Sequence, residues 1–154
     1  MLQTYSAIIA DASCFILLDK IDSLPLLQKL FTTVTTSPEI AIEFGKPLPD
    51  WVLIKSVQDK NFQNALFLEV DLGEATAIAL ATESQPALLI IDDLKGRKLA
   101  KRLHLTITGT LGLIVIAKRE GIVSQIKPLF DKIQATNFRI SPSLLQSILQ
   151  QAGE

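Results

Sequence analysis

The sequence predicts an α/β fold in which a mainly parallel β-sheet lies between layers of helices. Short apolar runs that are typical of buried parallel strands alternate along the chain with segments of helical period. Two of these runs, SAIIAD and ALLIIDD, end in acidic residues, at Asp11 and at the pair Asp92 and Asp93. The chain has 154 residues, of which 48% are hydrophobic and 20% charged, so it can bury a sizeable core and is not a disordered chain.

The first part of the chain predicts a strand, two short helices and a second strand. We expect the first strand at residues 6–10, because SAIIA is apolar and ends at an acid. Apolar residues repeat at a helical period across residues 12–31, and Pro25 predicts two helices there, since proline cannot donate a hydrogen bond inside a helix. The β-branched run TTVTTS at residues 32–37 predicts a short strand.

A helix, an edge strand and two more helices follow. Ser37 as N-cap and Pro38 in the first turn predict a helix over residues 38–44, which Gly45 ends. Residues 51–57 alternate loosely in polarity and predict an edge strand. Two segments of helical composition complete this part: residues 61–68 and residues 71–84.

The second half predicts two strands and several helices. The strands are expected at QPALLII, residues 85–91, and at LTIT, residues 105–108. Between them LKGRKLAKRLH predicts a basic amphipathic helix over residues 94–104, in which His104 meets the terminal carbonyls. The other helical segments are residues 109–121, 124–138 and 141–153.

Composition restricts the possible environment and partners of the protein. A net charge of −1 leaves no overall basic field for a nucleic acid, so such binding would depend on a local patch. The single cysteine, Cys14, excludes an intramolecular disulfide and fits a reducing compartment. We expect it to be a small core residue. The chain lacks a signal peptide and any apolar run of the roughly 18–20 residues that span a membrane. We expect one cytoplasmic domain, residues 1–154, with the helices of 124–151 as an appended part and no membrane contact.

The acids at the two strand ends predict a divalent-cation site. Ligands bind beyond the carboxyl ends of the strands in open parallel sheets, so neighbouring strands would aim Asp11 and the Asp92–Asp93 pair at one place. Like charges repel, and a bound cation compensates them. Ser13 would support such a site through its hydroxyl. Taken alone, Asp11 is better explained as the N-cap of the following helix, and one member of the pair could cap the helix after it.

Basic residues follow the acidic pair. They are Lys95, Arg97, Lys98, Lys101 and Arg102. One interpretation is a solvated helix face that pairs with carboxylates. The other is a basic edge that holds a phosphodiester backbone while metal-bound acids carry out the chemistry.

Two helical glutamates are further candidates. Glu43 lies in the last turn of its helix, where a carboxylate is unfavourable next to the helix dipole, although an exposed acid is its ordinary fate. Glu74 comes three residues after Asp71, which predicts a capping box. That cap does not explain Gly73, a poor helix former that would allow another group to approach closely.

The order of these motifs resembles the PIN-domain family, which includes the VapC-like ribonuclease toxins of bacterial toxin–antitoxin pairs. The resemblance is carried by IIADAS, PEIAIEF, GEATAIALA, LLIIDDLKGRKLA and ITGTLGLIVIAKREGIV, over about residues 6–123. It is closest to a PIN-like branch with GE, IDD and TGT motifs. One departure is Ile91, at a position where many members of the family have threonine or serine.

The resemblance implies a three-layer α/β/α domain and a Mg²⁺- or Mn²⁺-dependent endoribonuclease. It assigns catalysis to Asp11, Glu43, Glu74 and Asp93, metal binding to Asp11, Glu74, Asp92 and Asp93, and places Thr108 and Thr110 beside the site. Within the acidic pair Asp93 is the preferred ligand, and Asp92 is its alternative or partner, or a cap or supporting group. The implied partners are an RNA substrate, a small antitoxin protein and a second copy in a homodimer. The alternatives are a non-catalytic PIN-like module that binds RNA or protein, and, ranked lower, an aspartate-nucleophile phosphatase, which usually has a second aspartate where this chain has Ser13.

Overall fold

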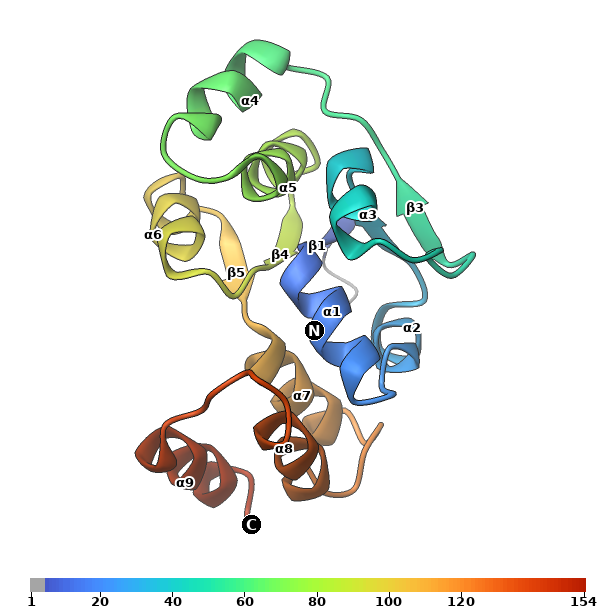
Figure 1. Ribbon diagram of the computed structural model, residues 1–154, viewed down its shortest axis with the longest axis vertical. Coiled ribbons are helices and arrows are strands. Elements are labelled where there is room, and N and C mark those ends of the chain that lie inside the picture. The colour runs from blue at the N-terminus through green and yellow to red at the C-terminus, as the bar shows by residue number, and fades with distance from the viewer. Residues whose placement is uncertain (1–4) are drawn as a thin grey trace.

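The computed structural model describes residues 5–154, and within this range it contains a five-stranded parallel β-sheet (Figure 1). The strands are β1 (Ala7–Ala10), β2 (Val34–Thr36), β3 (Val52–Ile54), β4 (Ala87–Ile90) and β5 (Thr106–Thr108). Their order in the sheet is β3-β2-β1-β4-β5, and every neighbouring pair is parallel. The predicted α/β fold with a parallel sheet is therefore confirmed, as is the edge position of the third strand.

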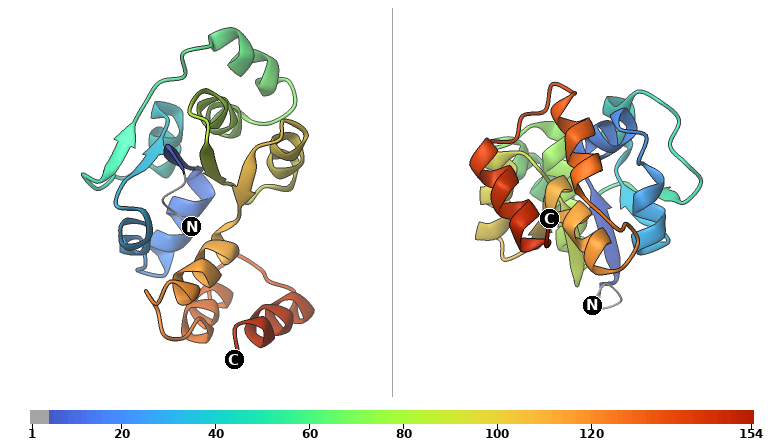
Figure 2. Two further views of the ribbon diagram at one scale, coloured as in Figure 1. Left: turned by 180° about the vertical axis from the view of Figure 1, so that it is seen from behind. Right: turned by 90° about the horizontal axis from the view of Figure 1, so that it is seen from below.

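Helices flank the sheet and complete a three-layer α/β/α arrangement (Figures 1 and 2). They are α1 (Ala12–Lys20), α2 (Pro25–Phe31), α3 (Pro38–Phe44), α4 (Lys60–Phe67), α5 (Leu72–Glu83), α6 (Leu94–Arg102), α7 (Thr110–Arg119), α8 (Lys127–Gln134) and α9 (Pro142–Gln151). Helix α5 packs against the two central strands, β1 and β4, and is buried along most of its length. Within residues 5–154, no helix is long and apolar enough to cross a membrane.

Helix boundaries follow the predicted capping residues. Ser37 caps α3 by accepting a hydrogen bond from the Ile40 backbone, and Gly45 ends the helix with a left-handed φ of 77°. Asp71 and Glu74 form the predicted capping box at the start of α5. A side chain that accepts the free backbone N–H groups of a first turn typically stabilises a helix by about 1 kcal/mol.

The register of the central strands brings two acidic strand ends together. Ala10, the last residue of β1, pairs with Ile90, the last residue of β4. Asp11 therefore leaves the sheet beside the segment that carries Asp92 and Asp93. Ile91 continues this alignment, because its backbone N–H donates to the carbonyl of Thr108 at the end of β5.

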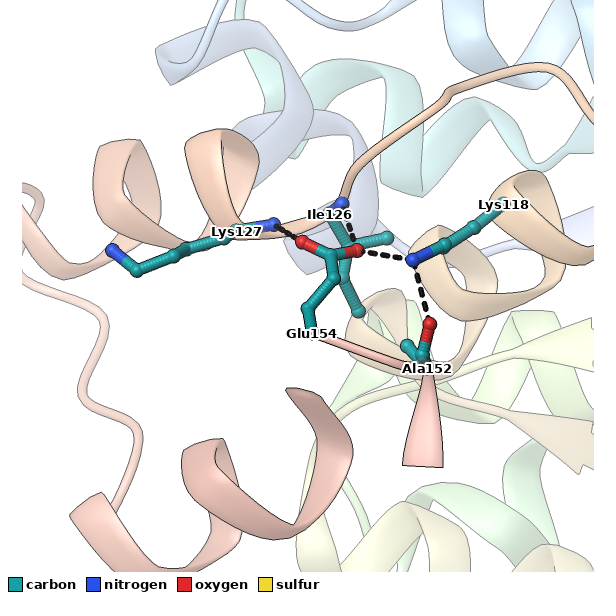
Figure 3. Close-up of polar contacts among 5 residues, drawn as sticks. All are labelled: Lys118, Ile126, Lys127, Ala152 and Glu154. Carbon is teal, nitrogen blue, oxygen red and sulfur yellow. Dashed lines mark hydrogen bonds and ion pairs between the residues drawn. The ribbon is translucent and has the colours of Figure 1, made fainter. Parts of the chain in front are cut away.

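The C-terminal helices contribute to the core and are fixed at their end by one carboxylate. Phe130 and Ile133 of α8 are fully buried in the same apolar cluster as the sheet. Glu154 accepts hydrogen bonds from Lys118 Nζ at 2.6 Å and from the backbone N–H groups of Ile126 and Lys127 at 2.8 and 3.0 Å (Figure 3). The Lys118 hydrogen bond is the main reason that the pKa of Glu154 falls to about 2.

Two predictions of local structure have clear outcomes. Cys14 is a fully buried core residue, as expected for an isolated cysteine of this kind. The prediction for His104 is corrected, because its backbone N–H rather than its imidazole is what bonds a terminal carbonyl, that of Lys101. His104 takes a left-handed φ of 61° to do so.

Candidate functional site

A cavity of about 500 Å³ lies at the carboxyl edge of the central strands and is lined by acidic side chains. These are Asp11, Glu43, Asp71, Glu74, Asp92 and Asp93. Among the described residues, the only cationic side chain that lines this cavity is Lys20, from the end of α1. The four residues assigned to catalysis, Asp11, Glu43, Glu74 and Asp93, thus line one cavity together with Asp92. They come from four separate segments of the chain.

Asp11 is the most deeply placed of these acids. It is 5% exposed, and its Oδ1 accepts a hydrogen bond of 2.8 Å from the Ala12 backbone, so it is also the N-cap of α1. The pKa of Asp11 is raised to about 7, mainly by burial and in smaller part by the negative charge of Glu43. Asp11 can therefore cap α1 through Oδ1 and still present its second carboxylate oxygen to the cavity.

Asp92 is held in place from two sides. Its Oδ2 accepts hydrogen bonds from Thr110 Oγ1 at 2.6 Å and from Ser13 Oγ at 3.2 Å. Its Oδ1 accepts the backbone N–H of Thr110 at 2.7 Å. Gly109 leaves the space for this contact, because a Cβ there would lie 2.9 Å from Asp92 Oδ1. Ser13 and Thr110 therefore orient this carboxylate.

The roles within the acidic pair differ from the prediction. Asp92 was expected to be the cap or supporting group, but Asp93 is the N-cap of α6 and accepts the Gly96 backbone N–H at 2.9 Å. The physical reason is that Asp93 directly precedes Leu94, the first residue of α6, so it occupies the N-cap position and leaves Asp92 outside the cap. Asp93 still lines the cavity and keeps its other oxygen outside the cap.

Glu43 and Glu74 both lie near the start of α5, where Glu43 approaches Gly73. A Cβ at Gly73 would lie 2.7 Å from Glu43 Oε1, so glycine at this position admits the glutamate side chain. The sequence predicted a close approach there. Desolvation raises the pKa of Glu43, and the charge of Asp71 adds to this effect. Desolvation also raises the pKa of Glu74 to about 8, with further contributions from Asp71 and Asp93.

The donor set of the cavity suits a hard divalent cation. It consists of carboxylate oxygens, which Mg²⁺ and Mn²⁺ prefer, and the raised pKa values of Asp11 and Glu74 reflect uncompensated burial and repulsion. Within residues 5–154, no three acidic, histidine or cysteine side chains converge closely enough to enclose a metal ion.

The basic helix α6 is less available than its sequence suggests. Arg97 donates from Nη1 to the carbonyl of Ile91 at 2.9 Å, and Arg102 pairs with Glu69 at 3.2 Å. Lys95, Lys98 and Lys101 are exposed. All five lie outside the lining of the acidic cavity. Arg97 is thus partly a structural residue that fixes the chain just before Asp92, and the predicted basic edge is reduced to three free lysines.

Several residues of the cavity were not predicted from sequence, and both predicted threonines, Thr108 and Thr110, lie outside its lining. Thr108 directs its hydroxyl to the carbonyl of Gly109 at 3.3 Å and does not line the acidic cavity. Lys20, Asn137 and Phe138 do line it. Asn137 is 117 positions from Lys20, its hydrogen-bond partner, so no local sequence signal could have identified this contact.

Comparison with protein families gives one match. A family model described as a PIN domain (DUF3368) matches residues 7–154, which includes every strand, every helix and all six acids of the cavity. No curated protein matches the chain at a significant level, and no solved structure does.

Proposed function

The chain belongs to the PIN-domain family, whose members are generally nucleases that use divalent metal ions, and we propose that it is a Mg²⁺- or Mn²⁺-dependent endoribonuclease. The observation that carries this proposal is the cavity in which six carboxylates gather at the ends of β1 and β4. The proposed reaction is hydrolysis of an RNA phosphodiester bond. The proposed catalytic residues are Asp11, Glu43, Glu74 and Asp93, with Asp92 as an additional metal ligand.

Asp11, Glu74, Asp92 and Asp93 are the residues that would hold a cation. Asp11 is fixed by β1 and by its cap, and Asp92 is fixed by Ser13 and Thr110. Asp93 has one oxygen committed to the backbone of α6 and one remaining. A bound divalent cation supplies a water of lowered pKa and neutralises charge on the phosphate. Because these carboxylates are already held in position, little rearrangement of the site is needed during the reaction.

Glu43 and Glu74 complete the acidic wall from α3 and α5. Glu43 occupies the space that Gly73 leaves open, and Glu74 is restrained by its hydrogen bond from the Asp71 backbone at 3.4 Å. Their proposed role is to bind and orient water in the cavity. Misplacement of such groups by about 1 Å can lower a rate by a factor of about 10².

A non-catalytic PIN-like module that binds RNA or protein is the second candidate. It is favoured by the separation of the acids, since no three of the described candidate ligands converge on one point. It is also favoured by Ile91, which is fully buried where many PIN enzymes place a hydroxyl. Both observations bear on activity and leave the fold unaffected.

The proposal also includes a toxin–antitoxin role. Apolar side chains flank the acidic residues on the surface: Ile42 precedes Glu43 and is 79% exposed, and Leu94 follows Asp93 and is 66% exposed. Exposed apolar residues of this kind support binding of a protein partner, either a small antitoxin or a second copy in a homodimer. Residues 1–154 are proposed to be one domain that includes the helices of 124–151, because Phe130 and Ile133 share the core of the sheet.

The test is cleavage of single-stranded RNA by the purified protein with Mg²⁺ or Mn²⁺, compared with Asp11→Asn. Asp22→Asn is the matched control, because Asp22 is exposed, lies outside the cavity and has a φ of 55° that asparagine tolerates. The proposal predicts metal-dependent cleavage that Asp11→Asn lowers by at least about 10²-fold. Equal cleavage by wild type and Asp11→Asn would overturn it, and RNA binding without cleavage would favour the non-catalytic module.

A further inference from the structure

The loop between α8 and α9 brings a neutral and aromatic wall to the acidic cavity. Asn137 and Phe138 belong to this loop, and both line the cavity together with Lys20 of α1. Lys20 Nζ donates a hydrogen bond of 3.1 Å to Asn137 Oδ1. The backbone N–H of Phe138 donates to Thr136 Oγ1 at 3.1 Å. The Lys20–Asn137 bond links the wall to α1, and the Phe138–Thr136 bond lies within the loop itself.

Phe138 lies between two cavities. One is the acidic cavity of about 500 Å³, and the other, of about 430 Å³, is lined by Arg97, Thr108 and Gly109. Phe138 and Asp92 line both. The aromatic side chain is half-buried, so part of its surface remains open. A flat apolar group beside a carboxylate site has the size and chemistry to bind a nucleobase, because every base has a face that stacks on an aromatic ring.

Lys20 supplies a positive charge in the same place. The side chain is exposed, and its ammonium group has three donors, of which Asn137 takes one. No acidic residue among the described ones forms an ion pair with it. Since the remaining charged groups of the cavity are carboxylates, Lys20 is the group of this cavity that would attract a phosphate without a bound cation.

We propose that Phe138 and Lys20 form a substrate subsite in which a base of single-stranded RNA stacks on Phe138 while a neighbouring phosphate binds Lys20. This inference rests on the proposed nuclease function and adds residues that bind the substrate away from the acids. It also defines the form of the RNA. In a duplex each base is covered by its neighbours, so a paired base is not free to stack on a side chain.

The binding test uses a fluorescein-labelled single-stranded RNA of twelve nucleotides and measures Kd by anisotropy in Mg²⁺. The measurements are made on the Asp11→Asn protein, so that cleavage does not interfere. We expect Phe138→Ala to raise Kd by about tenfold, the effect of losing one stacked base. Phe138→Trp should restore binding. Phe67→Ala is the matched control, because Phe67 lies on α4, is 51% exposed and is outside both cavities.

The phosphate contact is tested by Lys20→Gln, with Lys29→Gln, an exposed lysine of α2, as control. Lys20→Gln should weaken binding and lower the slope of log Kd against log salt by about 0.7, the value for one phosphate contact on a single strand. The control should leave both quantities unchanged. Blunt duplex RNA of the same length should bind at least about tenfold more weakly than the single strand, through loss of the stacked base.

The outcomes separate the subsite from the nuclease. If the wild type cleaves RNA but Phe138→Ala binds like its parent, the subsite is refuted and the nuclease proposal stands. If Phe138→Ala loses affinity while the wild type cleaves nothing, the subsite stands and catalysis is refuted. Equal binding of duplex and single strand, failure of Phe138→Trp to restore affinity, or absence of RNA binding would each overturn the subsite.

Discussion

Replacement of Gly73 by alanine separates stability from activity at the acidic cavity. The new Cβ would lie 2.7 Å from Glu43 Oε1, and its next contacts, Ile40 Cγ1 at 3.7 Å and Asp71 Oδ1 at 3.8 Å, are ordinary ones. The Glu43 carboxylate would therefore have to retreat by roughly 0.7 Å to reach the 3.4 Å at which such contacts become ordinary. Because Glu43 is exposed and its side chain is flexible, this movement is easy.

The expected free energy of unfolding is unchanged or higher. Alanine is favoured over glycine by up to about 1 kcal/mol in a helix interior, and by less in the first turn, where Gly73 lies. This corresponds to a Tm rise of at most about 4 °C for a chain of this size. The cleavage rate should nevertheless fall by about 10- to 100-fold, since small displacements of a positioned group are enough for such losses.

The assay is a thermal melt and an RNA cleavage rate for four proteins: wild type, Gly73→Ala, Glu43→Ala and the double variant. If Gly73→Ala acts by moving Glu43, it should have no further effect on activity once Glu43 is alanine. Full activity of Gly73→Ala would refute the role of Glu43. If Gly73→Ala lowered the free energy of unfolding by more than about 2 kcal/mol, the claim that the Glu43 carboxylate moves aside easily would be refuted.

Three further predictions concern the cation, the C-terminal carboxylate and the core. Mg²⁺ at a hundred times its Kd should stabilise the protein by about 2.7 kcal/mol, which corresponds to a rise of about 5–10 °C in Tm. Asp11→Asn should reduce this rise in Tm. An equal rise in both proteins would place the cation elsewhere. The pKa of Glu154 falls from 4.5 to about 2 on folding. Its contribution to stability is therefore full above pH 4.5 and disappears as the pH falls toward 2. Glu154→Gln should have a lower Tm than wild type at pH 7 and the same Tm at low pH, and a Tm difference that does not change with pH would contradict the ion pair. Phe130→Ala should cost about 3–5 kcal/mol in a denaturant titration, because Phe130 is fully buried; a change below about 1 kcal/mol would show that α8 is not part of the folding unit.

The strand ends were predictable because their signal is local. An apolar run followed by an acid identifies both the strand and the residue at its carboxyl end, which holds for Asp11 and for the Asp92–Asp93 pair. The parallel pairing of β1 with β4 then makes neighbours of residues that lie about eighty positions apart. The capping box at Asp71 and Glu74 was predictable for the same reason, since a cap is a pattern over four consecutive residues.

Contacts that depend on packing could not be predicted. The choice between Asp92 and Asp93 as helix cap depends on where the turn after β4 begins, and both residues have the same chemistry. Arg97 has the composition of a nucleic-acid contact, but the fold places its guanidinium against the Ile91 carbonyl. The wall of Asn137 and Phe138 depends on how the last two helices return to α1, which has no sequence pattern.

The proposal of a metal-dependent nuclease site is tested most directly by the cleavage of single-stranded RNA. Cleavage by the wild-type protein is measured in Mn²⁺ or Mg²⁺ and again in EDTA, and cleavage by Asp92→Asn is measured with the cation present. The account predicts cleavage only with the cation, and a loss of at least about 10²-fold in Asp92→Asn, whose folded structure should be retained. Cleavage that persists in EDTA, or that is unchanged in Asp92→Asn, would contradict a nuclease site built on the acids at the ends of β1 and β4.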